Sequence, residues 1–335
     1  MGFTVSSLSQ WNDEKSDKAE WILKPLLGGY GMKHLTNKKF GLKGQNILLP
    51  ELESTAPAQS GYSCGFTSSG TTTITQTTLT SVPFTVNESI CLKDLEQYFT
   101  LNTLPGSSNP DTFDMLDTWV DRKLQKISQN FGKALWQGKT TYTNDTWLKL
   151  QNGFLNDIDA ASDEVIVTGG GAGTAITTSN VRTIFEEALF SSSTGLFAIP
   201  QILESNPIAF CGQDTFATLQ LKLMQDNLFH ISAGNQDSAN GKMGMYEMIY
   251  PGSQIKVVGI PELNSTNSVE TGGLPTEVKN RIVCTYQDNL IVGMNAENDI
   301  SDFKVWYSED DDLVKFRLRG HFGTAIQHTD LVVTY

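Results

Sequence analysis

The stretch PDTFDMLDTWVDRKLQKISQNFGKALWQG, residues 110–138, carries the strongest structural signal in the chain. Its apolar residues follow one another at intervals of three or four, which places them along one face of an α-helix. Asn109 and Pro110 suit the start of that helix, and Gly138 suits its end. The sequence therefore predicts a helix over about 110–137 with a buried stripe of Phe113, Leu116, Val120, Leu124, Ile127, Phe131 and Leu135.

Residues 44–92, on the N-terminal side of this helix, contain no lysine and no arginine. Two runs rich in β-forming residues, 46–53 and 71–86, flank a Gly/Ser-rich middle. The second run, TTTITQTTLTSVPFTV, is dense in threonine and suits a strand exposed to water on both faces. A long two-stranded excursion of this kind is marginal alone. We expect it to lie on another part of the chain or on another molecule.

Residues 8–28, at the start of the chain, read as a short helix with Trp11, Trp21 and Leu23 as its apolar members. Exposed tryptophans on a small helix are typical of a surface that contacts a partner.

The C-terminal region is expected to be β. FKVWY and VKFRLRG flank the acidic turn SEDDDL, and apolar residues alternate with Lys315, Arg317 and Arg319. This pattern predicts a hairpin with one apolar face and one basic face. Between this hairpin and the long helix, residues 146–285 read as a mixture of helices and short strands, including the strand PIAFCG and a helix that opens at Asp214.

The bulk composition narrows the classes of function. A net charge of -13 disfavours a nucleic-acid reader. The four cysteines are scattered and read as reduced thiols, and no run of about eighteen apolar residues suggests a membrane span. We therefore expect a soluble protein made in the cytoplasm.

No convincing cofactor or metal site emerges from the sequence. The Gly-rich stretch EVIVTGGGAGTAITTS fits neither phosphate-binding glycine pattern. Asp310, Asp311 and Asp312 lack the spacing of a calcium loop and read as a solvated turn that could pair with a basic patch on a neighbouring molecule.

Gly61-Tyr62-Ser63-Cys64-Gly65 matches the G-x-S-x-G motif of serine hydrolases. A nucleophile elbow needs a hydrophobic strand before the serine and a helix after it, and neither is present around Ser63. We interpret the motif as a loop, with a hydrolase as the enzyme-class alternative.

In order, these elements resemble the major capsid proteins of tailed bacteriophages, which share the HK-ninety-seven-like fold. The resemblance extends to local sequence in three stretches: ITQTTLTSVPFTVNESICLKDLEQYF, KALWQGKT, and residues 288–335. The first and last are most similar to capsid proteins of phages that infect Bacteroides-like hosts, including the crAss-like group.

The resemblance implies an α+β fold with four parts. These are an N-terminal arm (1–43), an extended E-loop β-hairpin (44–92), a P-domain with the spine helix (93–145 and 286–320), and a mixed α/β A-domain (146–285 and 321–335). Candidate contacts between subunits are Trp11, Trp21, Tyr62, Phe66, Asp310, Asp311 and Asp312.

The function implied is self-assembly into the hexamers and pentamers of an icosahedral or elongated shell around a double-stranded DNA genome. Such a protein is no enzyme and binds no cofactor. It is assembled in the host cytoplasm with a separate scaffold protein, a portal and possible cement protein, and ends in the virion. Because the E-loop contains no lysine, a lysine crosslink is not expected there. The alternative within the same fold is the shell of an encapsulin nanocompartment.

Overall fold

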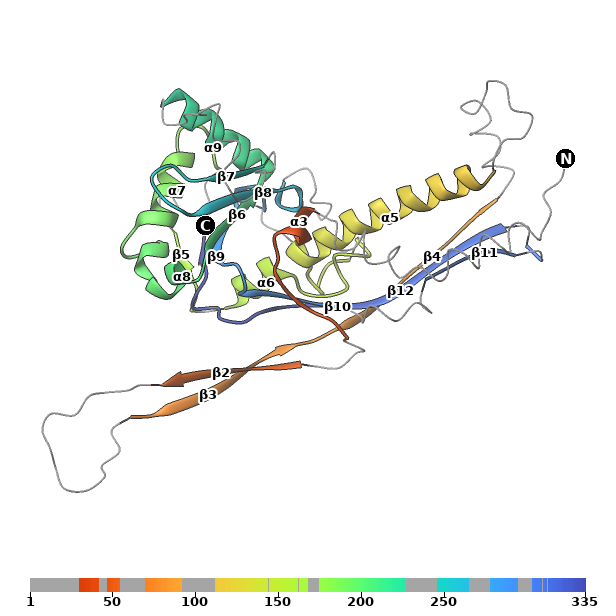
Figure 1. The fold of residues 1–335 in the computed structure, drawn as a ribbon, viewed down its shortest axis with the longest axis horizontal. Helices are drawn as coiled ribbons and strands as arrows, with labels where there is room; N and C mark the ends of the chain where they lie inside the picture. The colour runs from red at the N-terminus through yellow and green to blue at the C-terminus, as the bar shows by residue number, and fades with distance from the viewer. Residues whose placement is uncertain are drawn as a thin grey trace, which may run out of the picture.

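The computed structural model describes the following residues: 30–41, 47–54, 70–91, 112–143, 145–161, 163–167, 175–226, 246–264, 278–294, 303–308, 310–311 and 313–335. They form two sheets, a long helix and a projecting hairpin, and the molecule is elongated (Figure 1).

The long helix α5 (Thr112–Gln137) confirms the helix predicted over 110–137. The predicted stripe faces inward wherever its side chains are described, at Val120, Leu124, Ile127, Phe131 and Leu135. Phe113 and Leu116 lie within α5, but their side chains are outside the described part.

The first sheet is built around the long strand β12 (Leu313–Ile326). Along one edge, β12 pairs antiparallel with β11 (Phe303–Ser308) near its start and with β10 (Leu290–Met294) near its end. Its other edge pairs antiparallel with β4 (Val82–Cys91). A short strand, β1 (Asn37–Lys39), adds to β10 in parallel. The antiparallel β11–β12 pair confirms the hairpin predicted near the C-terminus.

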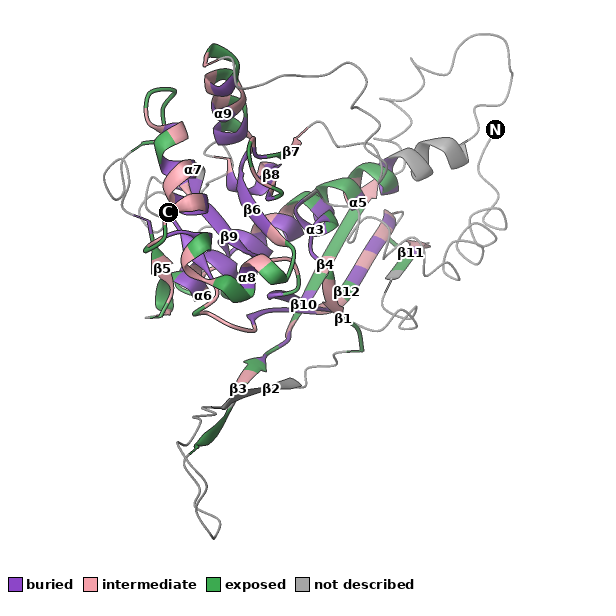
Figure 2. Ribbon diagram, turned by 60° about the vertical axis from the view of Figure 1, so that its left-hand side comes forward, coloured by how far each residue is buried: buried purple, intermediate pink, exposed green. Residues whose placement is uncertain are grey.

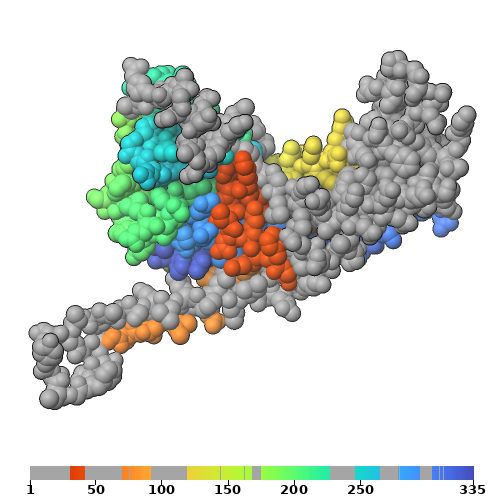
Figure 3. Space-filling view, viewed as in Figure 1, coloured from red at the N-terminus to blue at the C-terminus, as the bar shows by residue number. Residues whose placement is uncertain are grey.

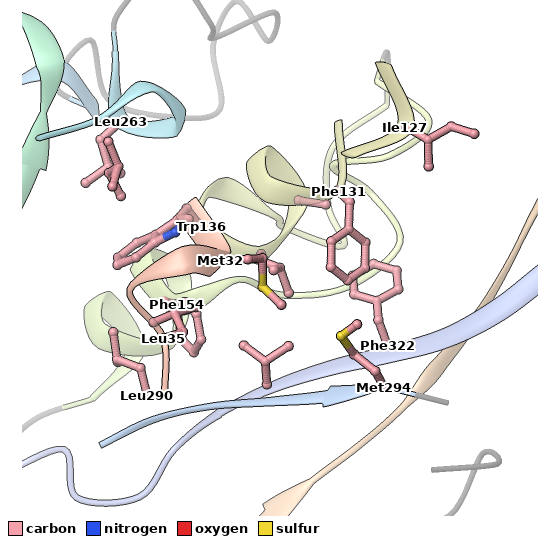
Figure 4. Packing of buried hydrophobic residues seen from close by; sticks show 14 of the residues in the cluster. Met32, Leu35, Ile127, Phe131, Trp136, Phe154, Leu263, Leu290, Met294 and Phe322 are labelled. Atoms are coloured by element: carbon pink, nitrogen blue, oxygen red, sulfur yellow. The ribbon is translucent and has the colours of Figure 1, made fainter. Parts of the chain in front are cut away.

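The contact between α5 and this sheet is aromatic and tight (Figure 4). Ring centroids of Phe131 and Phe322 lie 4.9 Å apart, those of Trp119 and Phe316 6.0 Å, and Phe84 of β4 contacts Phe322 at 5.6 Å. Burial alternates along the first half of β12, as the banded colouring of Figure 2 shows. This alternation assigns the apolar residues of β12 to the helix side.

The second sheet has the order β5 (Val165–Ile166), β13 (Val333–Thr334), β9 (Ile282–Tyr286), β6 (Pro207–Gly212), β8 (Lys256–Ile260), β7 (Glu247–Ile249). The predicted strand PIAFCG is β6. Helices α7 (Val181–Phe190), α8 (Pro200–Glu204) and α9 (Gln213–Gln225) and the short turn η1 (Leu196–Ala198) gather around it. Buried side chains of α7, α9 and the sheet form a second hydrophobic cluster.

Three further short elements lie at the junction of the two sheets, next to the short helix α3 (Tyr30–Lys33). The helix α6 (Phe154–Ala160) and the turns η3 (Pro261–Leu263) and η5 (Val278–Asn280) contribute Phe154, Leu263 and Val278 to the same cluster as α5. The core of the long helix therefore continues into the second sheet without a break.

The projecting hairpin pairs β2 (Ile47–Ser54) with β3 (Thr72–Leu79), in register from Ile47 with Leu79 to Ser54 with Thr72. It extends away from the body of the molecule (Figures 1 and 2). The prediction of one β run over 71–86 is wrong in its extent, because the run divides between β3 and β4, and β4 leaves the hairpin to pair with β12.

A close approach of two backbones explains the division of this run. Leu79 is buried against Ile291 and Ala325 at the base of the hairpin. Gly323 of β12 lies so close to the backbone of Thr80 that an added Cβ would stand 2.3 Å from the Thr80 oxygen. Burial of Leu79 therefore fixes the point where the chain changes from the hairpin to the sheet. The division of the sequence into domains stays a prediction.

Replacing Phe131 by alanine is expected to lower the free energy of unfolding by about 3–5 kcal/mol, since it opens a cavity under α5 beside Phe322 and Phe84. The exposed Gln129, on the same helix, serves as control: Gln129→Ala is expected to change it by no more than about 0.5 kcal/mol. Urea unfolding of the three proteins measures both values. Equal, small losses in the two variants would contradict the packing described for α5.

Candidate assembly surfaces

A basic face lies on the side of the first sheet opposite α5. Because side chains of a strand alternate between the two faces, burial of Val314, Phe316 and Leu318 under α5 turns their neighbours to the other side. The residues carried on that side are Lys315, Arg317 and Arg319 of β12, together with Lys304 and Trp306 of β11, which pair with Arg317 and Lys315 in the register.

Trp306 lies at the centre of the positive charges on this face. The Arg317 guanidinium carbon is 5.5 Å from the centre of the Trp306 ring, and the Lys304 ammonium is 5.9 Å from it. Cations at this distance from an aromatic face are attracted to its π electrons. The indole therefore holds two cations in place on a partly exposed surface.

The charges on this face are largely unneutralised. Lys315 pairs with Asp311, but no carboxylate of the described residues forms an ion pair with Lys304, Arg317 or Arg319. A shallow hollow of about 360 Å³ lies here, lined by Lys315, Phe316, Arg317 and Arg319 of β12, by Trp306, and by Asn87, Glu88 and Ser89 of β4. Such a surface suits an acidic and partly polar partner.

The hairpin β2–β3 is the second candidate surface. Its described side chains are mostly exposed, and Ile74 leaves 65% of its surface in water. A two-stranded ribbon with little buried apolar area needs a surface to lie on.

The structure describes only two of the predicted contact residues, Asp310 and Asp311, and both are exposed in the turn between β11 and β12. Asp311 accepts hydrogen bonds from Lys315 Nζ and from Ser308 Oγ, the latter at 3.1 Å. The bond from Lys315 is the main cause of a lowered pKa for the Asp311 carboxyl. Trp11, Trp21, Tyr62, Phe66 and Asp312 lie outside the described residues, and so does Ser63.

Sequence reasoning found the basic face of β12 but missed Lys304 and Trp306. The signal was present in FKVWY, where these two residues alternate with the buried Val305. The register of β11 against β12 is what places them beside Arg317 and Lys315.

Among the described residues, no group of three or more His, Cys, Asp or Glu side chains gathers in a way that could hold a metal ion. None of the helices in this part of the chain is long and apolar enough to cross a membrane. Cys91, Cys211 and Cys284 are free thiols, as predicted, and burial raises the pKa of Cys284 to about 12.

Comparison with known proteins finds similarity in structure only. No protein-family model matches the chain, and no curated protein matches its sequence. Among the solved structures that match, three illustrate a similarity that extends over most of their length. The capsid of a native GTA particle has a TM-score of 0.54 at 10% identity, covering 90% of this chain and 88% of its own. A chain of Gordonia phage Cozz has a TM-score of 0.53 at 11% identity, covering 92% and 86%.

The third is the capsid of the Myoviridae phage XM1, with a TM-score of 0.51 at 11% identity and 88% of both chains covered. The chain therefore has the mixed α and β fold of phage capsid proteins. The resemblance noted in the sequence is confirmed at the level of the fold, while the subgroup of phages stays a prediction.

If the basic face is a contact surface rather than part of the core, its arginines contribute little to folding. Arg317→Gln combined with Arg319→Gln is expected to change the free energy of unfolding by less than about 1 kcal/mol, since relief of repulsion offsets the lost cation–π contact. Phe316→Ala, on the opposite face of the same strand, is expected to cost about 3–5 kcal/mol. Guanidinium unfolding measures both; comparable losses would place the arginines among the residues that hold the fold.

Proposed function

We propose that this chain is a major capsid protein, which self-assembles into the hexamers and pentamers of a closed shell around the double-stranded DNA genome of a phage. The observation that carries the proposal is similarity to the capsids of a GTA particle and of phage XM1 over about nine-tenths of the chain. In this proposal α5 is the spine helix and the projecting hairpin β2–β3 is the E-loop.

Charge supports a contact between the hairpin of one copy and the basic face of the next. Residues 44–81 carry Glu51 and Glu53 and no lysine or arginine. The basic face offers Lys304, Arg317 and Arg319, which have no described carboxylate partner within the chain. The hairpin also extends away from its own body, so it is placed to reach a neighbour (Figure 2).

Each such contact is weak, because exposed ion pairs typically contribute about 0.2–1 kcal/mol. A closed shell repeats the contact in every subunit, and the gain from multivalency makes the whole stable. The absence of lysine from the hairpin favours a non-covalent shell. A separate scaffold, a portal and a cement protein remain part of the proposal, as does assembly in the host cytoplasm.

Reversing the charge of the basic face tests the contact. Arg317→Glu combined with Arg319→Glu is expected to reduce the assembled fraction at least about tenfold, which corresponds to about 1.4 kcal/mol. Adding Glu51→Lys and Glu53→Lys to the same chain is expected to restore assembly, because the attraction is re-created with opposite signs. Analytical ultracentrifugation of the expressed proteins measures the assembled fraction.

Lys149→Glu is the matched control, since Lys149 is exposed and lies in a turn outside this face. It is expected to leave assembly unchanged. If the four-fold charge swap assembles no better than the two-fold reversal, the proposed contact between hairpin and basic face is wrong. If wild-type protein gives no assemblies under any condition, the proposed shell itself is wrong.

The contents of purified particles separate the two kinds of shell with this fold. Nuclease-protected double-stranded DNA in particles from producing cells is expected for a capsid. Particles that contain a co-purifying enzyme and no protected DNA would instead support an encapsulin-type compartment. Labelling of Ser63 by a fluorophosphonate probe would support the hydrolase alternative.

A further inference from the structure

Residues 30–39 cross the junction between the two sheets as a strap. They comprise α3 (Tyr30–Lys33) and β1, and the red segment of Figure 3 lies on the surface beside the second sheet and the long helix. Met32 and Leu35 are buried in the cluster that contains α5. Beyond them, Thr36 Oγ1 donates to the Gln287 oxygen at 3.1 Å and Asn37 Nδ2 to the Asp288 oxygen at 2.9 Å.

One end of the strap contacts a buried carboxyl, that of Glu262 in η3. The backbone N–H of Gly31 donates to Glu262 Oε1 at 3.1 Å. Glu262 is 5% exposed, and its Oε2 has no hydrogen-bond partner among the described residues. The main chain of Glu262 is also fixed, because Gln137 Nε2 donates to its carbonyl oxygen.

Two glycines make room for this carboxyl. An added Cβ would stand 2.6 Å from Glu262 Oε1 at Gly132 of α5, and 2.7 Å from the carboxyl carbon at Gly31 of α3. The side chain is therefore enclosed between the backbones of two helices. A carboxyl so enclosed is shielded from water, which makes its charged form costly.

Few charges face Glu262. Of the elements packed on η3, α5 contributes Lys133, itself influenced by Lys126 and Asp145. Of the other elements packed on η3, α3 carries Lys33, with His34 directly after it, and β6 carries the buried thiol Cys211. Burial is the largest influence on Glu262 and leaves the pKa of its carboxyl above the ordinary 4.5, although the hydrogen bond from Gly31 and the charge of Lys133 act to lower it.

His34, the residue directly after α3, makes the other polar contact of the strap, and its charge behaves in the opposite way. His34 is 5% exposed, and its Nε2 lies 3.3 Å from Glu247 Oε1 of β7. Lys256 of β8 contacts Glu247 Oε2 at 2.8 Å, and Lys33 lies 3.7 Å from Oε1. Burial lowers the pKa of His34 from 6.5 to about 4, although Glu247 acts to raise it and Lys256 and Lys33 act to lower it.

We propose that residues 30–39 form a proton-gated strap, which docks best across the junction when Glu262 carries a proton and His34 carries none. The two groups change the strength of docking in opposite directions as the pH changes. Docking takes up a proton at Glu262, so that group weakens docking as the pH rises from 4.5 through its raised pKa. Docking releases a proton from His34, so that group weakens docking as the pH falls from 6.5 towards 4.

The carboxyl of Glu247 also weakens docking of the strap when the pH falls. Burial alone would raise the pKa of its carboxyl, but the hydrogen bond from Lys256 and the nearby charges of Lys256, His34 and Lys33 leave it lowered. Only the part of this lowering that comes from His34 and Lys33 depends on the strap, because Lys256 lies on β8; that part favours docking above pH 4.5 and is lost as the pH falls below that value.

Amide hydrogen exchange of the full chain, followed by mass spectrometry, separates the two effects. Between pH 4.5 and 6.5, protection of residues 30–39 is expected to rise with pH in Glu262→Gln, and to fall with pH in His34→Gln. Each slope reaches at most about tenfold per pH unit, the limit for one proton. Wild-type protein is expected to show a shallower slope than either variant.

Exchange is corrected for its intrinsic pH dependence, and β6 serves as an internal reference for global folding. Glu204→Gln, at an exposed site on α8, is the matched control and keeps the wild-type slope. Slopes of the same sign in Glu262→Gln and His34→Gln, or no slope in either, would overturn the proposal.

A steric variant tests the geometry without a change of pH. Gly132→Ala places a Cβ against the Glu262 carboxyl and is expected to speed exchange in residues 30–39 while β6 stays protected. Unchanged exchange in the strap would contradict the enclosed carboxyl on which the proposal rests.

Discussion

The packing of α5 against β12 is the contact on which the rest of the molecule depends. A single apolar stripe on the helix meets every second side chain of the strand, and aromatic pairs such as Phe131 with Phe322 fill the space between them. Because side chains of a strand alternate, the same contact obliges Lys315, Arg317 and Arg319 to face away from the helix. The core and the basic face are thus two results of one constraint.

The length of β12 extends this constraint across the protein. The strand pairs with β11 at one end and with β10 at the other, while β4 runs along its second edge and leads back to the hairpin. Burial of Leu79 anchors the hairpin where β3 gives way to β4. A buried anchor and an exposed ribbon are therefore joined within one segment of chain.

The features set by local periodicity were predictable from the sequence. The stripe of α5 and the alternation of β12 each depend on a spacing within one element, and both are found in the structure. The division between β3 and β4 was not predictable, because threonine-rich alternation continues through it and only contact with Gly323 of β12 decides it. The burial of Glu262 between Gly31 and Gly132 was likewise hidden, since these residues are far apart in the chain and meet only after folding.

The most direct test of the central claim is the mass of the purified full chain by light scattering, with negative-stain electron microscopy of the same sample. A shell-forming protein is expected to give rings of five or six subunits or closed shells, with masses that are multiples of the 36.8 kDa chain. A particle of 36.8 kDa that persists at high protein concentration, with a crowding agent and with co-expressed scaffold protein, would contradict the proposed shell.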